Sequence, residues 1–574
     1  MECGSEASAH AEADASALQT GQRAAALAHA VGEGLGVRAK KRALPAHSEP
    51  KCCILISLEG GGLQVGIFSC VKSHAFGEDA RYDVALSAEL EQFVWDANPW
   101  WRGAPMRPLP RYRRWLFPTV LKRLQSPLAP VVALRGARQV GKTTLQLQII
   151  EHLLDEGVAP QRLFRVQFDE LPTLKGFQQP ILTLCRWFQS RVLNGSFNEW
   201  AQRGEPVYIF LDEVQNLPDW SAQVKALVDH HAVRVLLTGS SALRIEYGRE
   251  SLAGRITTVE LGSLLLREIA ELTGIGAIPS LAPENGLDAL RQQAFWQELR
   301  EAGQQHALAR DQAFEVYAAR GGYPFAYAQP LPDWEMLAEH LNETIVRRVL
   351  QHDLRVGERG RRRDPVLLEM LFRLACRYAG QAPSPTLYLR ELQETMQANI
   401  GWQRALAYLR FLNDSLLIRL IEPLEIRLKR RKSQPKVCLC DHSLRASWLR
   451  EVVPLTPDAL RQQPEQGTLA GHLAESIVGF FLSSIPNLSL NWYPERGVEP
   501  EVDFVLTVGD YRIPIEVKYR QRIDPHRDTL GLRALLEKTA NNAPFGVLIT
   551  LQDGADIPDP RIVALPLSTL LLMR

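Results

Sequence analysis

The feature that most constrains how this chain can fold is one stretch of eight residues, Gly136, Ala137, Arg138, Gln139, Val140, Gly141, Lys142 and Thr143. The stretch matches in full the phosphate-binding pattern G-x-x-x-x-G-K-[ST]. The apolar run 131–134 predicts a buried strand before it, and the amphipathic segment from Lys142 to about Leu154 predicts a helix after it. Strand, turn and helix together aim backbone N–H groups at a polyphosphate, so we expect these residues and Thr144 to bind ATP.

A second apolar run, 206–211, ends in two adjacent carboxylates, Asp212 and Glu213. In a parallel sheet such a strand is central, and its C-terminal end faces the phosphates. We expect Lys142 to reach the β- and γ-phosphates and the Thr143 hydroxyl to hold Mg²⁺. Asp212 is expected to act through the same Mg²⁺. Glu213 is expected to polarise the attacking water, a role that needs a carboxylate beside the metal and not on it.

Two further sets of residues are candidates for sensing or stabilising the γ-phosphate. The next apolar run, 233–237, is followed by Thr238 and Ser240, and a hydroxyl at this strand end could sense the phosphate or simply form a turn. Arg249 and Arg255 are candidates for a transition-state arginine, acting within the chain or across a subunit interface of a homo-oligomer. A solvated loop arginine is the alternative for each.

Composition sets limits on the remaining function classes. The chain has 574 residues, of which 46% are hydrophobic and 23% charged, the values of an ordinary globular protein of several domains. Lys and Arg number 66 against 65 Asp and Glu, so the net charge does not favour nucleic acid as a partner. No apolar run reaches the ~20 residues that a membrane-spanning helix needs. The acidic, Ala-rich beginning does not match a signal peptide, which favours a cytoplasmic location.

Changes in pattern along the chain predict five regions. Residues 1–89 are expected to be a disordered or poorly defined extension, because 1–50 hold few large apolar groups. Apolar runs alternate with helical stretches over 90–262, which predicts an α/β core with a parallel sheet whose strands are 131–134, 163–168, 207–211, 233–237 and 256–260. Residues 263–358 are expected to form a helical lid. A mainly helical domain that ends in a β-hairpin follows over 359–450, and a last α/β domain covers 466–574.

The fourth region has the pattern of a winged helix. Predicted helices at 365–378, 389–397 and 403–415 precede two predicted strands, 416–421 and 436–440. The segment 427–436 between the strands is strongly basic, and 359–363 adds a second basic patch. A basic wing suits phosphate contacts that give affinity without sequence choice, so DNA is the expected partner. A solvated basic loop and a protein-binding wing are the alternatives.

The last region carries a second set of chemical groups. Glu475 lies in a predicted helix, Asp503 begins a predicted strand, and Glu516 and Lys518 lie two residues apart in the next one. Residues two apart in a strand point to the same face, so a hairpin can gather Asp503, Glu516 and Lys518. Two carboxylates that hold Mg²⁺ beside a lysine that positions water are an arrangement for phosphodiester hydrolysis. The set resembles the PD-(D/E)-x-K nuclease fold of restriction-type enzymes, and Glu475 matches its helix glutamate.

The chain as a whole resembles a family of prokaryotic AAA-type ATPases with a C-terminal domain of unknown function. The resemblance covers about 90–574 and rests on five segments in order: 136–143, 211–215, 237–241, 252–255 and 321–324. It implies a P-loop fold of the additional-strand type, with Glu213 as the catalytic glutamate, and it agrees with a winged helix. We therefore expect a DNA-binding ATPase with a Mg²⁺-dependent nuclease domain, active in repair, mobile-element or antiphage processes. The alternatives are a nucleotide-switched scaffold whose nuclease-like domain does not cut, and an ATPase that acts on proteins.

Overall fold

The chain divides into two units, Met1–Ala80 and Arg81–Arg574. The computed structural model describes residues 56–59, 62–65, 85–169, 177–239, 252–282, 286–351, 364–396, 400–425, 434–495, 497 and 499–574. In the first unit the described part is one antiparallel hairpin, β1 (Ile56–Glu59) with β2 (Gly62–Val65). All of the predicted site residues belong to the second unit.

The first sheet of the second unit is fully parallel, and it confirms the five strands that the apolar runs predict. These are β3 (Val131–Gly136), β4 (Leu163–Gln167), β5 (Val207–Asp212), β6 (Val233–Gly239) and β7 (Ile256–Leu261). Their order is β4-β5-β6-β3-β7, with all neighbours parallel. Strand β6 therefore separates β3, which leads into the phosphate loop, from β5, which ends at Asp212. An intervening strand in this position is the expected feature of the additional-strand type.

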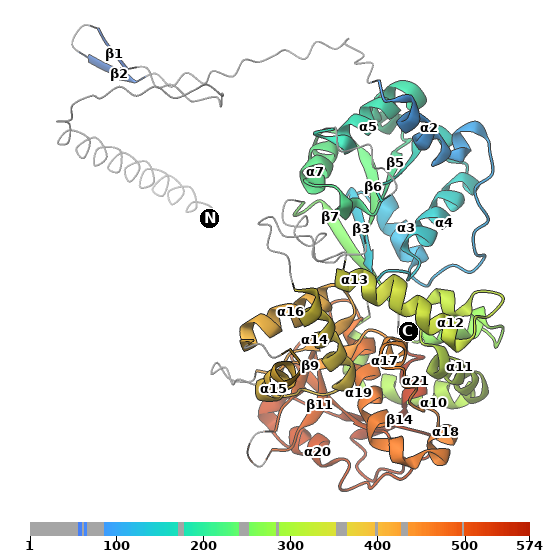
Figure 1. Cartoon of the computed structure of the whole chain (residues 1–574), viewed down its shortest axis with the longest axis vertical. Coiled ribbons are helices and arrows are strands. Elements are labelled where there is room, and N and C mark those ends of the chain that lie inside the picture. Colours follow the sequence, from blue (N-terminus) through green and yellow to red (C-terminus); the bar gives the residue numbers. More distant parts are fainter. Residues whose placement is uncertain are drawn as a thin grey trace, which may run out of the picture. The chain divides into compact units, whose positions relative to one another are not determined.

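Helices cover both faces of this sheet (Figure 1). The helices around this sheet are α2 (Ala88–Asp96), α3 (Phe117–Gln125), α4 (Lys142–Asp155), α5 (Pro180–Phe188), α6 (Phe197–Gln202) and α7 (Trp220–His230). Side chains alternate along β3, so Val132 and Leu134 pack into one core while Val131 and Ala133 pack into the other. Burying apolar side chains on both faces explains why the strands read as continuous apolar runs.

The middle of the chain is helical, as predicted, but one helix begins earlier than expected. Its elements are α9 (Leu266–Leu272), α10 (Gln293–Gln305), α11 (Ala307–Arg320), α12 (Trp334–Leu341), α13 (Arg347–Gln351), α14 (Pro365–Arg377), α15 (Pro385–Met396), α16 (Trp402–Asp414), β8 (Ile418–Ile421), β9 (Lys436–Leu439) and α17 (His442–Leu449). The expected start of α15 at residue 389 is wrong, because Pro385 fits the first turn of a helix, where its missing N–H is not needed.

The predicted hairpin is confirmed, but it does not end its region. Strands β8 and β9 are antiparallel, with Ile418 opposite Leu439 and Ile421 opposite Lys436. Helix α17 follows directly, because the Asp441 carboxylate accepts the Ser443 N–H and caps the helix. The basic segments 359–363 and 426–433 lie outside the described residues.

The C-terminal region is built on a mixed sheet of order β10-β11-β12-β13-β14. Strands β10 (Ser489–Tyr493), β11 (Val502–Val508) and β12 (Tyr511–Lys518) are antiparallel, and β13 (Gly546–Thr550) and β14 (Ile562–Pro566) continue the sheet in parallel. Its helices are α18 (Pro457–Gln462), α19 (Gly467–Ser483), α20 (Leu530–Leu536) and α21 (Leu567–Leu570). Helix α19 contacts both β9 and β12, so the hairpin of the middle region packs against this last domain.

A partly buried carboxylate, Glu260, connects the first sheet to the hairpin. Glu260 lies near the end of the edge strand β7, and its side chain is 19% exposed. It pairs with Arg135, 2.9 Å away on the neighbouring strand β3, and with Arg419 on β8. Burial by itself would raise the pKa of Glu260, but Arg419 and Arg135 together hold the pKa below its ordinary value of 4.5. The pairing joins three strands from distant parts of the sequence.

Replacing Glu260 by Gln should lower the free energy of unfolding by about 3 kcal/mol at pH 7, because two guanidinium groups then face each other without a counter-charge. A carboxylate with a lowered pKa stabilises the fold above its ordinary pKa, and this contribution is lost as the pH falls through the lowered value. Urea unfolding at pH 7 and pH 3 measures both effects. Glu343→Gln, which breaks an exposed pair with Arg347, is the control and should cost below about 0.5 kcal/mol. Equal losses for the two variants would contradict the assignment.

Candidate functional site

The phosphate loop lies between the end of β3 and the start of α4, and two glycines make its shape possible. A Cβ atom on Gly136 would come within 2.3 Å of the Leu261 carbonyl oxygen on β7. Gly141 has a φ of +94°, in the left-handed region that glycine adopts without strain. Larger residues at either position would displace the loop from the first turn of α4. The pattern thus has the strand, turn and helix that it requires.

The ammonium group of Lys142 points back at the loop and not into solvent. Lys142 is 5% exposed, and its Nζ donates to the carbonyl oxygens of Gly136 at 3.1 Å and Ala137 at 2.8 Å. These bonds hold the positive charge beside the N-terminus of α4. A terminal phosphate that enters the loop meets this charge together with the helix N–H groups.

The carboxylate of Asp212 is the point where the predicted residues meet. Asp212 is 1% exposed at the end of β5. Its Oδ1 accepts the hydroxyl of Thr143 at 3.3 Å and also the hydroxyl of Thr238. Thr238 Oγ1 in turn accepts the backbone N–H of Glu213 at 3.3 Å. Of the two hydroxyl candidates, Thr238 thus contacts the site, and Ser240 lies outside the described residues.

The sequence analysis missed a buried arginine, Arg165, that pairs with the same carboxylate. Its Nη2 lies 2.9 Å from Asp212 Oδ2, and its Nε donates to Gln146 Oε1 at 3.2 Å. The signal was present, because an arginine in the middle of the apolar strand 163–168 requires a buried partner. Asp212 therefore has one oxygen bound to the two hydroxyls and the other to a guanidinium.

Glu213 adopts a backbone conformation that is rare for its residue type. Its φ is +52°, and its carboxylate accepts a hydrogen bond from the side chain of Gln215. Left-handed backbone at a residue with a side chain costs free energy and is concentrated at functional sites. The turn places the Glu213 side chain on the wall of a cavity next to the phosphate loop.

That cavity has a volume of about 850 Å³, within the usual range for small-molecule sites of ~300–1,000 Å³. One part of its wall is the phosphate loop with the start of α4. The rest comes from segments that the sequence analysis did not assign to the site, including Tyr112, Leu272, Phe325, Tyr327 and Arg348. A polar end at the loop and an aromatic and apolar remainder suit a molecule with a polyphosphate at one end and a flat ring at the other.

Arg114, also missed, anchors the phosphate loop from behind. Its Nη1 donates to the Val140 carbonyl oxygen at 2.6 Å, and its Nε lies 2.9 Å from Glu268 Oε1. Glu268 is fully buried in α9 and also accepts the backbone N–H of Leu265 at 2.9 Å. A single ion pair thus fixes the loop to the first helix of the middle region.

In its own chain, the candidate Arg255 lies away from the phosphate loop. Arg255 immediately precedes β7, and Ile256 pairs in parallel with Val131 at the beginning of β3. The phosphate loop lies at the other end of β3, beyond Gly136 and about 16 Å away at ~3.3 Å per residue. The Arg255 side chain pairs instead with Asp229. A role across a subunit interface stays a prediction, and Arg249 lies outside the described residues.

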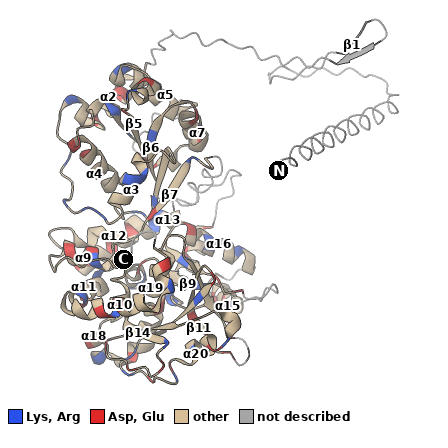
Figure 2. Ribbon diagram, turned by 180° about the vertical axis from the view of Figure 1, so that it is seen from behind, with Lys and Arg blue, Asp and Glu red and all other residues tan. Residues whose placement is uncertain are grey.

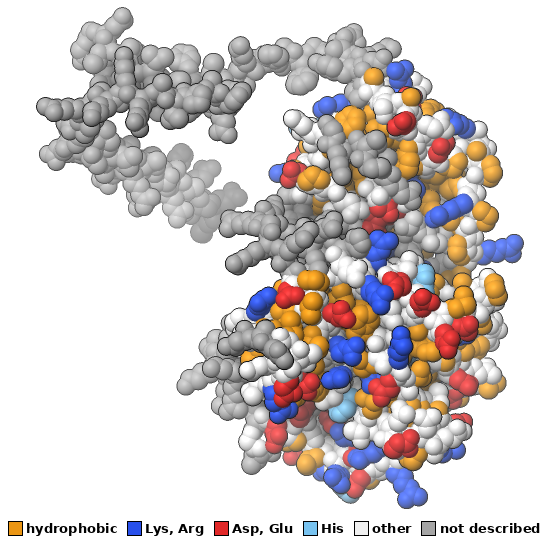
Figure 3. Space-filling model, viewed as in Figure 1, with side chains coloured by type: hydrophobic (Ala, Val, Ile, Leu, Met, Phe, Trp, Pro, Cys, Tyr) orange, Lys and Arg blue, Asp and Glu red, His pale blue; other side chains and the backbone are white. Residues whose placement is uncertain are grey.

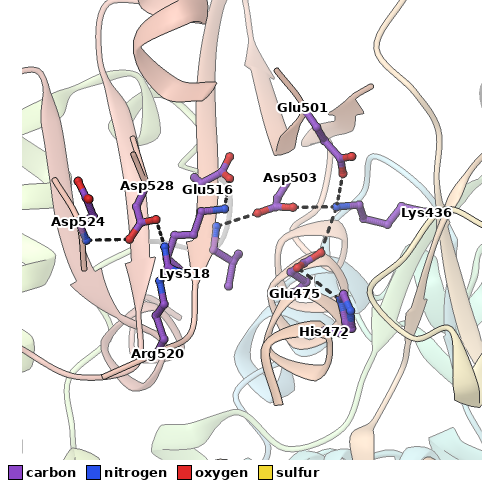
Figure 4. Close-up of polar contacts among 11 residues, drawn as sticks. Lys436, His472, Glu475, Glu501, Asp503, Glu516, Lys518, Arg520, Asp524 and Asp528 are labelled. Carbon is purple, nitrogen blue, oxygen red and sulfur yellow. Dashed lines mark hydrogen bonds and ion pairs between the residues drawn. The ribbon is translucent and has the colours of Figure 1, made fainter. Parts of the chain in front are cut away.

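The four nuclease-like residues of the C-terminal domain come together in space (Figure 4). Asp503 lies at the start of β11, and its Oδ2 accepts the backbone N–H of Val517 on β12 at 2.9 Å. Glu516 and Lys518, on the same face of β12, form an ion pair with each other. Glu475 faces Asp503 from α19, and both approach one lysine ammonium group. We call these carboxylates, together with Glu501, the carboxylate centre.

That ammonium group belongs to Lys436, which the sequence analysis assigned to the basic tip of the wing. This assignment is wrong, because the Lys436 side chain is 1% exposed and its Nζ lies inside the carboxylate centre. The distances are 3.0 Å to Asp503 Oδ1, 3.2 Å to Glu475 Oε2 and 3.3 Å to Glu501 Oε1. A lysine at a strand end is usually exposed, so no sequence signal indicates its burial.

Proximity and burial shift the protonation of the carboxylate centre. Burial and the neighbouring Asp503 raise the pKa of Glu516 to about 8, and burial with Asp503 also raises the pKa of Glu475. Burial acts in the same direction on Asp503, but Lys436 and Lys518 hold its pKa below the ordinary value. Glu516 Oε2 is buried and has no hydrogen-bond partner within the described part of the chain.

The two candidate sites differ in how well they fit the predicted Mg²⁺. Thr143 and Asp212 offer a hydroxyl and a carboxylate oxygen side by side next to the cavity, the oxygen ligands that Mg²⁺ prefers. At the carboxylate centre, an ammonium already lies among the oxygens of three carboxylates. In the described residues, no group of three His, Cys, Asp or Glu side chains is arranged to hold a metal ion. The carboxylate centre, as arranged, does not fit Mg²⁺.

Comparisons with known proteins agree with the nucleotide site. A family profile described as an AAA domain matches residues 129–270, and one described as a domain of unknown function (DUF8612) matches residues 311–453. With the geometry above, the first match supports a P-loop ATPase domain of the AAA type at residues 129–270. No profile describes what the second region does.

Three uncharacterized proteins and one solved structure are similar to parts of this chain. The uncharacterized protein MJ1637 of Methanocaldococcus jannaschii is 27% identical over 41% of this chain and 46% of its own length. The uncharacterized proteins Rv2008c of Mycobacterium tuberculosis and Mb2031c of Mycobacterium bovis are each 25% identical over 68% of this chain and 70% of their own. The Walker-type ATPase PABY2304 of Pyrococcus abyssi covers 60% of this chain at 15% identity, with a TM-score of 0.36.

The described surface has mixed charge. Acidic and basic side chains are interspersed on the face in Figure 3, and Figure 2 shows both signs on the elements around each sheet. The basic segments that predict DNA contact are not among the described residues, so the structure does not test that partner. Within the described ranges, no helix is long and apolar enough to cross a membrane.

Replacing Arg165 by Met should lower the free energy of unfolding by about 3–5 kcal/mol, because Asp212 is then buried without its counter-charge. Urea unfolding followed by tryptophan fluorescence measures the change. Adding Asp212→Asn should recover most of the loss, since the double variant leaves no unpaired charge. Arg186→Met, at an exposed arginine of α5, is the matched control and should change stability by less than about 0.5 kcal/mol. A loss for Arg165→Met as small as that of the control would contradict the pairing.

Proposed function

We propose that this protein hydrolyses ATP and uses the nucleotide cycle to control its hold on DNA. The observation that carries the ATPase part is the contact between Thr143 and Asp212, with Glu213 on the wall of the adjoining cavity. A chance match to the loop pattern has no reason to place a helix-start hydroxyl against a carboxylate from a strand sixty-nine residues later.

The proposed mechanism assigns one task to each group. The loop N–H groups and Lys142 bind the β- and γ-phosphates and stabilise the charge that develops on them. Thr143 and Asp212 would hold Mg²⁺, which supplies charge neutralisation on the phosphate oxygens when bound. Glu213 orients the attacking water and accepts its proton. The buried Arg165 holds the Asp212 carboxylate in place through its guanidinium, so it is a positioning residue.

DNA is proposed as the partner on the basis of the hairpin region. Helices α14 and α16 contact each other, and α16 contacts β8, so the hairpin is attached to a small helical domain. The segment that joins β8 to β9 contains Arg427, Lys429, Arg430, Arg431 and Lys432. A cluster of five positive charges on a hairpin connection suits the phosphate backbone of a duplex. The winged-helix assignment rests on the same features.

The carboxylate centre supports a second candidate function, Mg²⁺-dependent DNA cleavage. The close approach of Glu475, Asp503, Glu516 and Lys518 favours it, because this set is the one that the nuclease resemblance requires. The ammonium of Lys436 among the same carboxylates favours a domain that binds without cutting. In the described arrangement we propose the non-cutting function as the working state of this domain.

Purified full-length chain should turn over ATP with Mg²⁺, and two variants should stop it for different reasons. Lys142→Ala should lower turnover at least ~100-fold by removing a phosphate contact. Glu213→Gln should keep ATP binding but lower turnover by ~10²–10⁴-fold, because proton acceptance is lost. Phosphate release and equilibrium binding of labelled ATP measure the two effects, and Glu205→Gln, at an exposed position, is the control. Turnover within threefold of wild type in Glu213→Gln would overturn the assignment of the water-orienting residue.

DNA binding is tested by replacing Arg430, Arg431 and Lys432 together by Ser. The variant should bind a duplex more weakly, and the slope of log K against log salt should flatten by up to about 3, because three phosphate contacts are lost. Fluorescence anisotropy over a salt series measures this, with ATP and without it. Unchanged affinity and slope would contradict the proposal that the segment joining β8 to β9 binds DNA.

The same preparations decide whether the centre cuts. Linear, branched and single-stranded DNA are incubated with Mg²⁺ or Mn²⁺, and Asp503→Ala is the matched variant. The non-cutting proposal expects intact DNA from both proteins. Cleavage by wild type that Asp503→Ala abolishes would establish the nuclease function instead.

A further inference from the structure

The carboxylate centre contains one ion pair more than the nuclease-like set requires. Lys518 already pairs with Glu516 on β12. Lys436 comes from a different domain, 67 residues before Asp503, and places its ammonium against Glu475, Glu501 and Asp503. A fully buried lysine of this kind is rare unless its charge is needed where it lies.

The position of Lys436 is built by several independent contacts. Its ammonium lies 5.2 Å from the ring centroid of Phe504 and 5.7 Å from that of Trp492, a cation–π arrangement on two sides. The Trp492 indole donates to the Gln434 carbonyl oxygen at 3.1 Å, which fixes the chain just before Lys436. Strand β9, which carries Lys436, is thus held against the domain that contains the carboxylates.

Strand β9 also packs directly on the helix that carries Glu475. The Leu439 N–H donates to the Ser476 hydroxyl of α19 at 2.8 Å. A Cβ atom on Gly479 would come within 2.4 Å of Cys438 Sγ, so the helix needs glycine there for β9 to approach. Glycine at this position of α19 therefore preserves the contact that brings Lys436 into the centre.

The centre retains a second sign of a cation-binding site. Glu516 is 7% exposed, and its Oε2 has no hydrogen-bond partner among the described residues. A buried carboxylate oxygen without a donor is costly unless a ligand or ion completes it. The Lys436 ammonium lies beside three carboxylates, and the fourth, Glu516, has an oxygen without a partner among the described residues. This is the arrangement of a cation site that a side chain occupies.

We propose that Lys436 is an internal cation that takes the divalent-metal position of the carboxylate centre, so that a metal ion binds there only when Lys436 withdraws. The inference rests on the proposed nuclease-like character of this domain and specifies how its metal site is controlled. The ammonium and a divalent ion compete for the same oxygens of Glu475 and Asp503, and like charges exclude each other at this distance. Because β9 carries Lys436, the position of the hairpin determines which cation occupies the carboxylate centre.

Mn²⁺ binding to the full-length chain, without nucleotide or DNA, tests the proposal. Electron paramagnetic resonance counts free and bound Mn²⁺ for wild type, Asp503→Asn, Lys436→Met, Lys436→Arg and Lys436→Met with Asp503→Asn. Wild type and Lys436→Arg should bind no more Mn²⁺ than Asp503→Asn. Lys436→Met should gain one site that binds at least tenfold more tightly than wild type, and the added Asp503→Asn should remove it.

Two results would overturn the proposal. One is a Mn²⁺ site in wild type that Asp503→Asn abolishes, a measurement that needs no Lys436 variant to fold. The other is a Lys436→Met chain with wild-type circular dichroism and no gain of Mn²⁺. If Lys436→Met does not fold, Lys436→Gln takes its place, because it also removes the ammonium group and should open the same site. The Mn²⁺ measurement needs neither ATP turnover nor DNA. Its outcome is therefore independent of whether the proposed ATPase and DNA-binding functions are correct.

Discussion

The nucleotide site depends on the buried carboxylate of Asp212. One of its oxygens receives the hydroxyls of Thr143 and Thr238, and the other receives the guanidinium of Arg165. These partners come from α4, β6 and β4, so the Asp212 carboxylate holds one helix and two strands in position against β5. A buried carboxylate is stable only with such partners, and the same partners aim it at the phosphate loop. Stability and function have one physical cause here.

Buried charge pairs also connect the ATPase domain to the rest of the second unit. Arg114 joins the phosphate loop to α9 through Glu268, and Glu260 joins the sheet edge to the hairpin through Arg419. Arg135, the other partner of Glu260, immediately precedes Gly136 of the loop. The loop thus follows an ion-paired arginine of β3, and its Val140 carbonyl oxygen accepts a hydrogen bond from a second ion-paired arginine, Arg114. The arginines that contact or precede the phosphate loop are therefore the same ones whose ion pairs join the ATPase domain to the middle of the chain.

Sequence reasoning succeeded where the signal is local. The loop pattern, the apolar strands and the two-residue spacing of Glu516 and Lys518 depend on neighbours in the chain, and the structure has each element in place. It failed where a charge is buried by a distant partner. The partners of Arg165 and Lys436 lie 47 and 67 residues away, so the sequence does not show which carboxylate each of them meets. Arg255 immediately precedes a parallel strand, and such a residue lies at the edge of the sheet away from the phosphates.

We propose that the chain has one cation site for catalysis at the phosphate loop and one that its own lysine fills. Crystals of Glu213→Gln grown with ATP and Mn²⁺ test both parts in a single anomalous difference map recorded at the manganese edge. We expect a peak beside Thr143 and Asp212 with ATP phosphates in the loop, and no peak at the carboxylate centre while Lys436 lies within it. A manganese peak among Glu475, Asp503 and Glu516 with Lys436 still in place, or an empty phosphate loop, would contradict this proposal.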